Sequence, residues 1–195
     1  MPSIDVKKAT IDTKIVYYGP GQSGKTSCLR FICDQWDAAR RGRFSSRPTK
    51  NDPDLYVDVL PLRYGRILGF DATVQLCSGP GLASAITTRR FLLRDTDGIV
   101  FVADSQISRR EANLDSMQEL EEILGAGGVG LAAIPHVLQY NKRDLERILT
   151  IRDMRTSLNR HDAPDFETSA ETGKGVLEAL EVLVEQLARD LESRL

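Results

Sequence analysis

The segment Gly19–Thr26, Gly-Pro-Gly-Gln-Ser-Gly-Lys-Thr, combines three glycines with a lysine and a threonine at close spacing. It fits the phosphate-loop pattern of Gly, four residues, Gly, Lys and Ser or Thr. The glycines permit backbone conformations and close approach that a side chain would block, so that successive amides can point at phosphate oxygens. We expect Lys25 to reach the β- and γ-phosphates and Thr26 to offer its hydroxyl to Mg²⁺.

A second polar cluster, Asn141-Lys142-Arg143-Asp144, follows an apolar run that ends at Tyr140. A carboxylate such as Asp144 can accept the ring N1–H and the exocyclic amine of guanine together, a donor pair that adenine does not offer. If Asp144 is buried, adenine would leave it unpaired at a cost in free energy. We expect Lys142 to lie along the base plane and Asn141 to tie this loop to the phosphate loop.

Farther along the chain, Glu167-Thr168-Ser169-Ala170 ends another short apolar segment. The backbone amide of Ala170 could donate to the guanine carbonyl. These motifs predict a guanine-nucleotide site whose candidate residues are Gly19, Gly21, Gln22, Ser23, Gly24, Lys25, Thr26, Ser27, Gly81, Asn141, Lys142, Asp144, Ser169 and Ala170, with Thr26 as the metal ligand.

The elements that must position these motifs follow from the apolar pattern. Runs bounded by turn residues predict strands over 14–18, 55–59, 72–76, 98–102 and 134–138. Apolar residues at helical spacing predict amphipathic helices over 114–124 and 176–191. Segments 54–60 and 66–77 have no helix between them and predict a hairpin. The remaining alternation predicts an α/β fold with a mostly parallel sheet and helices on both faces.

Length and composition predict one domain spanning residues 1–195, with 41% hydrophobic and 28% charged residues. A net charge of -2 gives no support for nucleic-acid binding. The sequence contains no apolar run of about 18 residues and no signal-peptide pattern, so we expect a cytoplasmic protein without a direct membrane anchor. We interpret the odd set of Cys28, Cys33 and Cys77 as buried thiols and not as a zinc site.

One stretch is unusually basic, with five positive charges and no acid between residues 39 and 50: Arg40, Arg41, Arg43, Arg47 and Lys50. Two interpretations are open. The stretch is either a solvated loop or a segment whose charge serves a phosphate or an acidic partner.

The phosphate loop, the Asn-Lys-x-Asp cluster and the Ser-Ala pair, in this order, resemble the Ras-like small GTPases. Within them the chain resembles the bacterial branch of MglA-type cell-polarity and gliding-motility GTPases, through segments 14–21, 60–62, 97–105 and 139–145. The resemblance implies a P-loop NTPase fold with a six-stranded, mostly parallel sheet and an extra N-terminal strand around Ile4–Ile11. It also implies a GTP-dependent switch that binds GTP or GDP with Mg²⁺.

The same resemblance implies partners. These are a roadblock-type, MglB-like activator and polarity or motility effector proteins, with recruitment of the chain to a cell pole.

The chain departs from this family where hydrolysis would be catalysed. Family members carry an Arg followed by a Thr, the Arg as an internal arginine finger and the Thr closing over the γ-phosphate and Mg²⁺, where this chain has Pro53 and Asp54. The Asp54 carboxylate would either bind Mg²⁺ or repel the γ-phosphate, and the sequence leaves both open.

The second switch also differs, because the family's Pro-Gly-Gln appears here as Pro80-Gly81-Leu82. Leu82 cannot orient the attacking water, whereas Gly81 keeps its amide for the γ-phosphate. Ser78 stands where other Ras-like proteins often carry an acid and this branch a Thr, and its hydroxyl could support Mg²⁺ through water. Pro53, Asp54 and Leu82 thus occupy the family's catalytic positions. We therefore assign no residue a catalytic role.

Two functions remain open. The chain is either a slow GTPase that needs an activator to supply the missing groups, or a nucleotide-holding pseudo-GTPase whose output is partner recruitment. An arginine finger raises the rate of GTP hydrolysis by roughly 10³–10⁵-fold. Loss of both the finger and the water-orienting residue therefore favours the pseudo-GTPase for the isolated chain. An ATP-dependent phosphotransferase has no support, because residues 141–144 select guanine.

Overall fold

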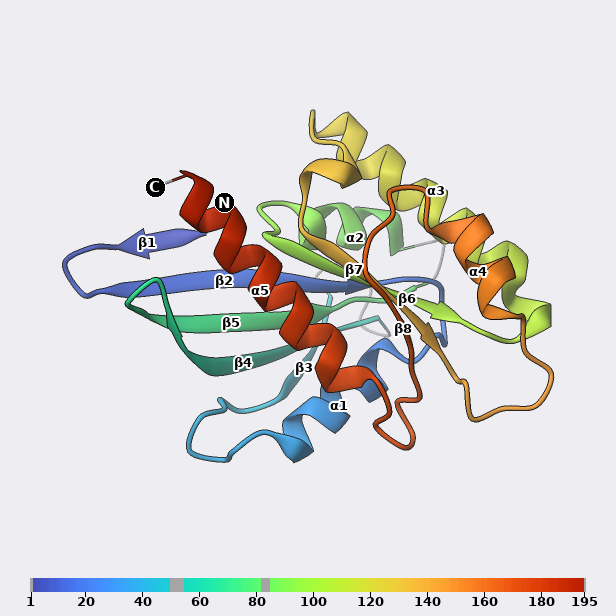
Figure 1. Ribbon diagram of the computed structural model, residues 1–195, viewed down its shortest axis with the longest axis horizontal. Helices are drawn as coiled ribbons and strands as arrows, with labels where there is room; N and C mark the ends of the chain where they lie inside the picture. The colour runs from blue at the N-terminus through green and yellow to red at the C-terminus, as the bar shows by residue number, and fades with distance from the viewer. Residues whose placement is uncertain (1, 50–54, 82–84, 195) are drawn as a thin grey trace.

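A computed structural model describes residues 2–49, 55–81 and 85–194, and at its centre lies one eight-stranded β-sheet (Figure 1). The strands are β1 (Ser3–Asp5), β2 (Thr10–Tyr18), β3 (Ser45–Pro48), β4 (Tyr56–Ile67), β5 (Phe70–Ser78), β6 (Gly98–Asp104), β7 (His136–Asn141) and β8 (Asp165–Glu167). Their order across the sheet is β3-β4-β5-β2-β6-β7-β8, and β1 pairs with β2.

The sheet is parallel from β5 to β8, whereas its other margin, β3 and β4, and the short β1 pair antiparallel. β2 pairs in parallel with β5 and β6, and β6, β7 and β8 continue in parallel. β4 and β5 form the predicted antiparallel hairpin. β3 adds an antiparallel edge strand beyond the predicted set, formed by the end of the basic stretch.

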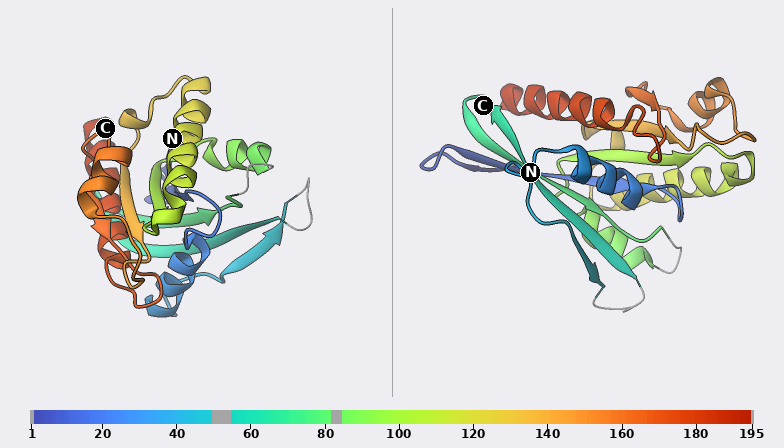
Figure 2. Two further views of the ribbon diagram at one scale, coloured as in Figure 1. Left: turned by 90° about the vertical axis from the view of Figure 1, so that its right-hand side faces the viewer. Right: turned by 90° about the horizontal axis from the view of Figure 1, so that it is seen from below.

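Five α-helices cover the two faces of this sheet: α1 (Lys25–Gln35), α2 (Ile86–Leu93), α3 (Arg110–Ala126), α4 (Ile151–Leu158) and α5 (Val176–Arg194). Helices α1 and α5 pack on one face, and α2, α3 and α4 pack on the other (Figure 2). This arrangement confirms the predicted α/β class with helices on both sides. None of these helices, within the part of the chain that the structure describes, is long and apolar enough to span a bilayer.

Strand β2 shows why both faces can be covered. Ile15 and Tyr17 are buried against the α1 and α5 side, whereas Val16 and Tyr18 are buried against the other. Side chains of a strand alternate between faces, so a continuous apolar run is what a central parallel strand requires.

The extra N-terminal strand is confirmed, but its bounds differ from the predicted Ile4–Ile11. β1 covers only Ser3–Asp5, and Ile11 already belongs to β2, where it lies opposite Ile4. The chain turns between them because the Asp5 carboxylate accepts the backbone N–H groups of Lys7 and Lys8. Asp side chains commonly stabilise turns in this way.

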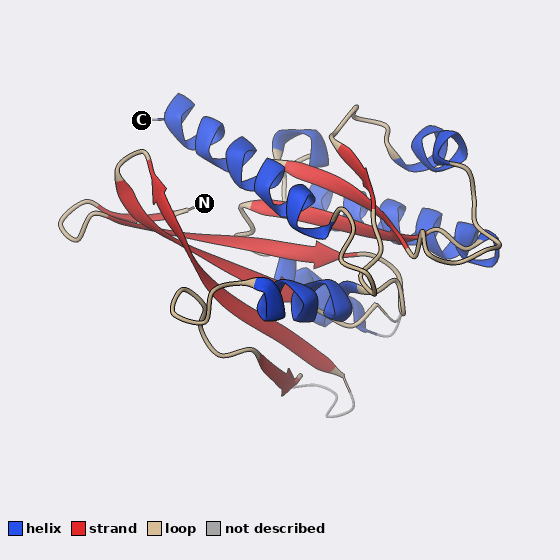
Figure 3. Cartoon of the chain, turned by 60° about the horizontal axis from the view of Figure 1, so that its bottom comes forward, coloured by secondary structure: helices blue, strands red, loops and turns tan. Residues whose placement is uncertain are grey.

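Parallel strands place their carboxyl ends at one edge of a sheet. Here β2, β6 and β7 end at Tyr18, Asp104 and Asn141, and the loops that follow them gather at that edge (Figure 3). The two main motifs of the sequence analysis begin directly after Tyr18 and Tyr140, so the fold brings them to the same edge.

Candidate functional site

The phosphate loop lies between β2 and α1, as predicted. Gln22 and Gly24 adopt left-handed backbone conformations, with φ of 64° and 101°. A Cβ at Gly24 would collide with the side-chain nitrogen of Asn141. Only glycine fits at Gly24, because both its φ and the close approach of Asn141 exclude a side chain.

Lys25 lies inside this loop. Its Nζ donates to the carbonyl oxygens of Gly19, at 2.9 Å, and Pro20, at 2.6 Å. The side chain is 7% exposed, and burial, with the neighbouring charges of Arg89 and Arg109 as lesser causes, lowers the pKa of Lys25 to about 8. A buried ammonium that donates to two carbonyl oxygens is a site that an anion would stabilise.

A buried carboxylate, Asp58 of β4, stands beside Thr26. The Thr26 hydroxyl donates to Asp58 Oδ2 at 2.6 Å, and the Ser78 hydroxyl donates to the same oxygen at 3.0 Å. Asp58 is not among the site residues predicted from the sequence. The structure places it, with Leu60 and Leu62, on the buried side of β4.

Asn141 joins three loops, and the predicted tie to the phosphate loop is present. Its Nδ2 donates to the carbonyl of Ser23 at 2.8 Å. Its Oδ1 accepts the Ala170 N–H at 2.9 Å and the Thr168 hydroxyl at 3.4 Å. The Ala170 amide, which we expected to donate to a guanine carbonyl, thus donates to Asn141 in this structure.

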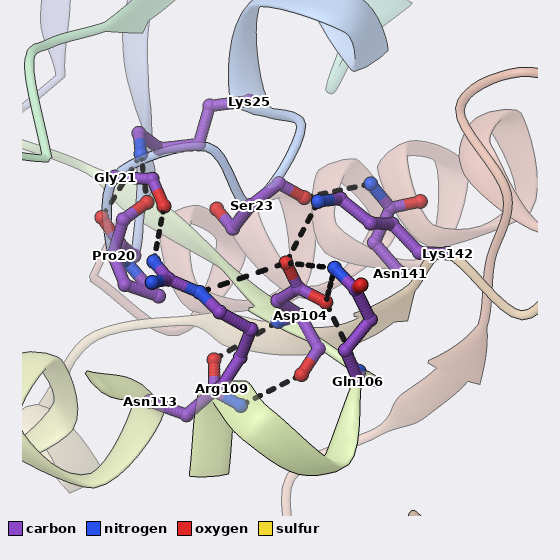
Figure 4. A network of polar contacts seen from close by, with 11 residues as sticks. Pro20, Gly21, Ser23, Lys25, Asp104, Gln106, Arg109, Asn113, Asn141 and Lys142 are labelled. Atoms are coloured by element: carbon purple, nitrogen blue, oxygen red, sulfur yellow. Dashed lines mark hydrogen bonds and ion pairs between the residues drawn. The ribbon is translucent and has the colours of Figure 1, made fainter. Parts of the chain in front are cut away.

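Lys142 adopts a left-handed conformation, with φ of 67°, and its Nζ lies 2.7 Å from Asp104 Oδ2 (Figure 4). Asp104, at the end of β6, is fully buried and also accepts the backbone and side-chain N–H groups of Gln106. A buried carboxylate therefore fixes the lysine of the Asn-Lys-x-Asp motif.

The other members of the predicted site differ in exposure. Asp144 is exposed, contrary to the buried position considered above, and Ser169 is buried with its hydroxyl accepting the Thr172 N–H at 3.2 Å. Ser27, on α1, is also exposed. An exposed Asp144 selects a base only when the base itself covers it.

Gly81 lies against the phosphate loop. A Cβ added there would collide with the backbone of Pro20 and Gly21, so the close approach requires glycine. The structure thus places Gly81 beside the loop, as the sequence predicted. Pro53, Asp54 and Leu82, the altered catalytic positions, lie outside the described residues.

The basic stretch splits into two groups. Arg40 donates to the Tyr64 carbonyl at 2.6 Å, and Arg41 donates to Cys33 Sγ at 2.7 Å. Arg43 and Arg47 are exposed. Arg40 and Arg41 anchor the stretch to the fold through these contacts, and the exposed Arg43 and Arg47 fit a solvated or partner-facing role. Lys50 lies outside the described residues.

The three cysteines are buried, as predicted. Burial raises the pKa of Cys28 to about 12 and that of Cys77 to about 11. These thiols therefore behave as small apolar side chains.

Comparison with known proteins agrees with this geometry. Residues 84–187 match Arf, the ADP-ribosylation factor family. The chain is 40% identical over 192 residues to Mutual gliding-motility protein MglA of Myxococcus xanthus, covering 98% of both chains. It is 32% identical over 101 residues to human ADP-ribosylation factor-related protein 1, covering 48% of each. This chain belongs to the Arf/Ras-like small GTPases.

Small GTPases bind guanine nucleotides together with Mg²⁺, and the residues of this small GTPase fit both. The fit to phosphate rests on the buried Lys25 ammonium, which the Gly19 and Pro20 carbonyls hold inside the loop. The fit to Mg²⁺ rests on two hydroxyls, of Thr26 and Ser78, gathered on the Asp58 carboxylate. Oxygen ligands of this kind are those that Mg²⁺ prefers.

Proposed function

We propose that this small GTPase is a guanine-nucleotide-dependent switch of the MglA type, acting in bacterial gliding motility or cell polarity. Gliding motility is taken from the name of the Myxococcus relative, and cell polarity from the resemblance described in the sequence analysis. The observation that carries the nucleotide assignment is the set of hydrogen bonds through which Asn141 joins the phosphate loop, its own loop and the Thr168–Ala170 turn. A base and a phosphate group can be bound together only if these loops keep a fixed separation.

Within this proposal, Lys25 and the backbone amides of the phosphate loop hold the β- and γ-phosphates. Thr26 is the protein ligand of Mg²⁺, and Asp58 orients the Thr26 and Ser78 hydroxyls around the ion. When bound, Mg²⁺ neutralises charge on the phosphates. Asp144 recognises guanine through two accepted hydrogen bonds, and Lys142, held by Asp104, flanks the base.

Hydrolysis by the isolated chain is proposed to be very slow or absent. Pro53 offers no positive charge, Asp54 adds a negative one, and Leu82 lacks a polar group to orient water. The output of the switch would then be the recruitment of partners. The alternative is an active GTPase that needs a group supplied by a roadblock-type activator.

Partners of the proposed switch are a roadblock-type activator and polarity or motility effectors, in a cytoplasmic protein recruited to a cell pole. The docking surface includes α2, where Phe91 is 69% exposed and Ile86 and Arg90 are also exposed. Arg89, the neighbour of Arg90 on α2, is buried and paired with Glu119 at 2.7 Å. It therefore holds α2 to α3 and faces no partner.

The test of the nucleotide proposal has two steps. Protein purified without added nucleotide is denatured, and the released nucleotide is identified by chromatography. Emptied protein is then titrated with fluorescent GDP and fluorescent ATP. Tight GDP binding with much weaker ATP binding supports the proposal, and comparable affinity for both refutes it.

A further inference from the structure

Arg109 connects the two halves of the site, although neither the phosphate-loop motif nor the Asn-Lys-x-Asp motif contains it. It ends the 3₁₀ turn Ile107–Arg109 that leads into α3. Its guanidinium donates to the carbonyl oxygen of Gly21 at 2.7 Å. Its Nε lies 3.9 Å from Asp104 Oδ2, the oxygen that also binds Lys142 (Figure 4).

The hydrogen bond to Gly21 fixes a peptide unit. The described chain contains no cis peptide bond, so the Gly21 carbonyl and the Gln22 N–H lie in one peptide plane and point in opposite directions. With the carbonyl held by Arg109, the Gln22 N–H points away from that side chain. The amides of such a loop are the groups that cradle phosphates.

The conformation of Gln22 explains why this peptide needs a restraint. Its φ of 64° lies in the left-handed region, which is unfavourable for residues other than glycine. An external hydrogen bond that stabilises the peptide offsets that unfavourable conformation.

Asp104 lies within ion-pair distance of Arg109 Nε, at 3.9 Å, without a hydrogen bond between them. The Asp104 side chain is fully buried. The Asn113 side chain accepts a hydrogen bond from the Asp104 N–H at 2.9 Å and donates one to the Asp104 carbonyl at 2.8 Å. Lys142 and Arg109 thus share one immobile carboxylate. A displacement of either cation changes the electrostatic environment of the other.

We propose that Arg109 is a positioning residue for phosphate recognition, which fixes the Gly21–Gln22 peptide and couples it through Asp104 to Lys142, the lysine that flanks the base. This inference rests on the proposed guanine-nucleotide binding. The alternative is that Arg109 only fastens α3 to the phosphate loop.

The test compares GDP with GMP, because the difference between their affinities isolates the contribution of the β-phosphate. Arg109→Ala should reduce GDP affinity by about tenfold or more, as expected for loss of a charged hydrogen bond, and should change GMP affinity much less. Arg110→Ala is the matched control, since Arg110 is the exposed neighbour on α3. Arg109→Lys keeps the positive charge but lacks the planar guanidinium, so its GDP affinity should lie between those of the parent and Arg109→Ala. It replaces Arg109→Ala in the test if the alanine variant does not fold.

A double variant separates positioning from fastening. In a Gln22→Gly background the loop no longer needs help to adopt a left-handed conformation, so Arg109→Ala should there cost much less GDP affinity. An equal loss in both backgrounds, or an unchanged ratio of GDP to GMP affinity in Arg109→Ala and Arg109→Lys, would overturn the inference. Absence of GDP binding by the parent protein would instead refute the proposed function.

Discussion

Asp58 and Ser78 are direct cross-strand partners on β4 and β5, and the Ser78 hydroxyl donates to Asp58 Oδ2 at 3.0 Å. By its resemblance to Ras-like proteins, Ser78 occupies a position where those proteins often carry an acid. The structure supplies an acid from the neighbouring strand, directly opposite that position. The site thus contains a carboxylate, that of Asp58 on β4, although β5 has Ser78 at the corresponding position.

Asp58→Asn should weaken the Mg²⁺ dependence of nucleotide binding. The amide keeps the size of the side chain and can still accept from Thr26, but it removes the negative charge. We expect the Mg²⁺ concentration needed for full GDP affinity to rise by about tenfold, equivalent to about 1.4 kcal/mol. GDP titrations at several Mg²⁺ concentrations measure this. Asp71→Asn, at an exposed site on β5, is the control, and an identical Mg²⁺ dependence in both variants would contradict the role of Asp58.

Lys25 should make the stability of the nucleotide-free protein depend on pH. Because burial lowers its folded pKa to about 8, the unfolded chain binds more protons between about pH 8 and 10.5, and the stability contributed by this residue rises with pH across that window. Below that window the full penalty for burying the charge is present. Lys25→Met should therefore be more stable than the parent at pH 7, by up to about 3 kcal/mol, and the difference should shrink toward pH 10.

Urea unfolding at both pH values measures this difference. Lys174→Met, at an exposed lysine, should show no such trend. If Lys25→Met is less stable than the parent by the same free energy of unfolding at both pH values, burial of the Lys25 ammonium does not destabilise the parent protein.

The phosphate loop and the Asn-Lys-x-Asp loop could be predicted because each is a short segment whose residue types and spacing carry the chemistry. Their meeting point could also be predicted, since both follow strands of one parallel sheet. Asn141 confirms this, because its hydrogen bond to Ser23 spans 118 positions of sequence.

Asp58 and Arg109 could not be predicted in the same way. The contact of Asp58 with Ser78 depends on the register of the β4–β5 hairpin, and a shift of one residue would turn Asp58 to the opposite face. Arg109 lies 88 positions from Gly21 in a segment without a motif. The burial of Arg89 depends on how α2 is rotated about its axis, since its neighbour Arg90 points to solvent.

Guanine selection should depend on the Asp144 carboxylate. Asp144→Asn replaces an acceptor by a donor, so preference should move from guanine toward xanthine nucleotides, which carry an acceptor where guanine carries the amine. Competition of GDP and XDP against a fluorescent nucleotide measures the change, which we expect to exceed tenfold in the affinity ratio. Glu146→Gln, at a nearby exposed acid, should leave the ratio unchanged. If Asp144→Asn keeps the parent's preference, base recognition lies elsewhere.

Partner binding should depend on the exposed face of α2. Phe91 is 69% exposed, and replacing it by serine should weaken binding of a purified roadblock-type protein from the same organism by about tenfold or more, as for an aromatic anchor. Val6→Ser, at a residue 75% exposed in the β1–β2 turn, is the matched control. Equal binding by both variants would remove α2 from the docking surface.

Slow hydrolysis should originate at three positions and not in the nucleotide pocket. Pro53 supplies no charge to the γ-phosphoryl oxygens, Asp54 brings charge of the wrong sign, and Leu82 leaves the attacking water unoriented. Because the three act on one transition state, Leu82→Gln alone should recover little. The combined change Pro53→Arg, Asp54→Thr and Leu82→Gln should raise single-turnover GTP cleavage by about tenfold or more, while GDP affinity changes little.

Rapid-quench assays with the parent and the triple variant decide between the outcomes. Rapid GTP cleavage by the parent alone would refute the pseudo-GTPase proposal. A triple variant that binds GTP and Mg²⁺ but stays inactive would place the defect in the rest of the site. Ser78 is then the first candidate, because its hydroxyl is committed to Asp58, and Ser78→Thr, which matches the related branch, tests it in the triple background.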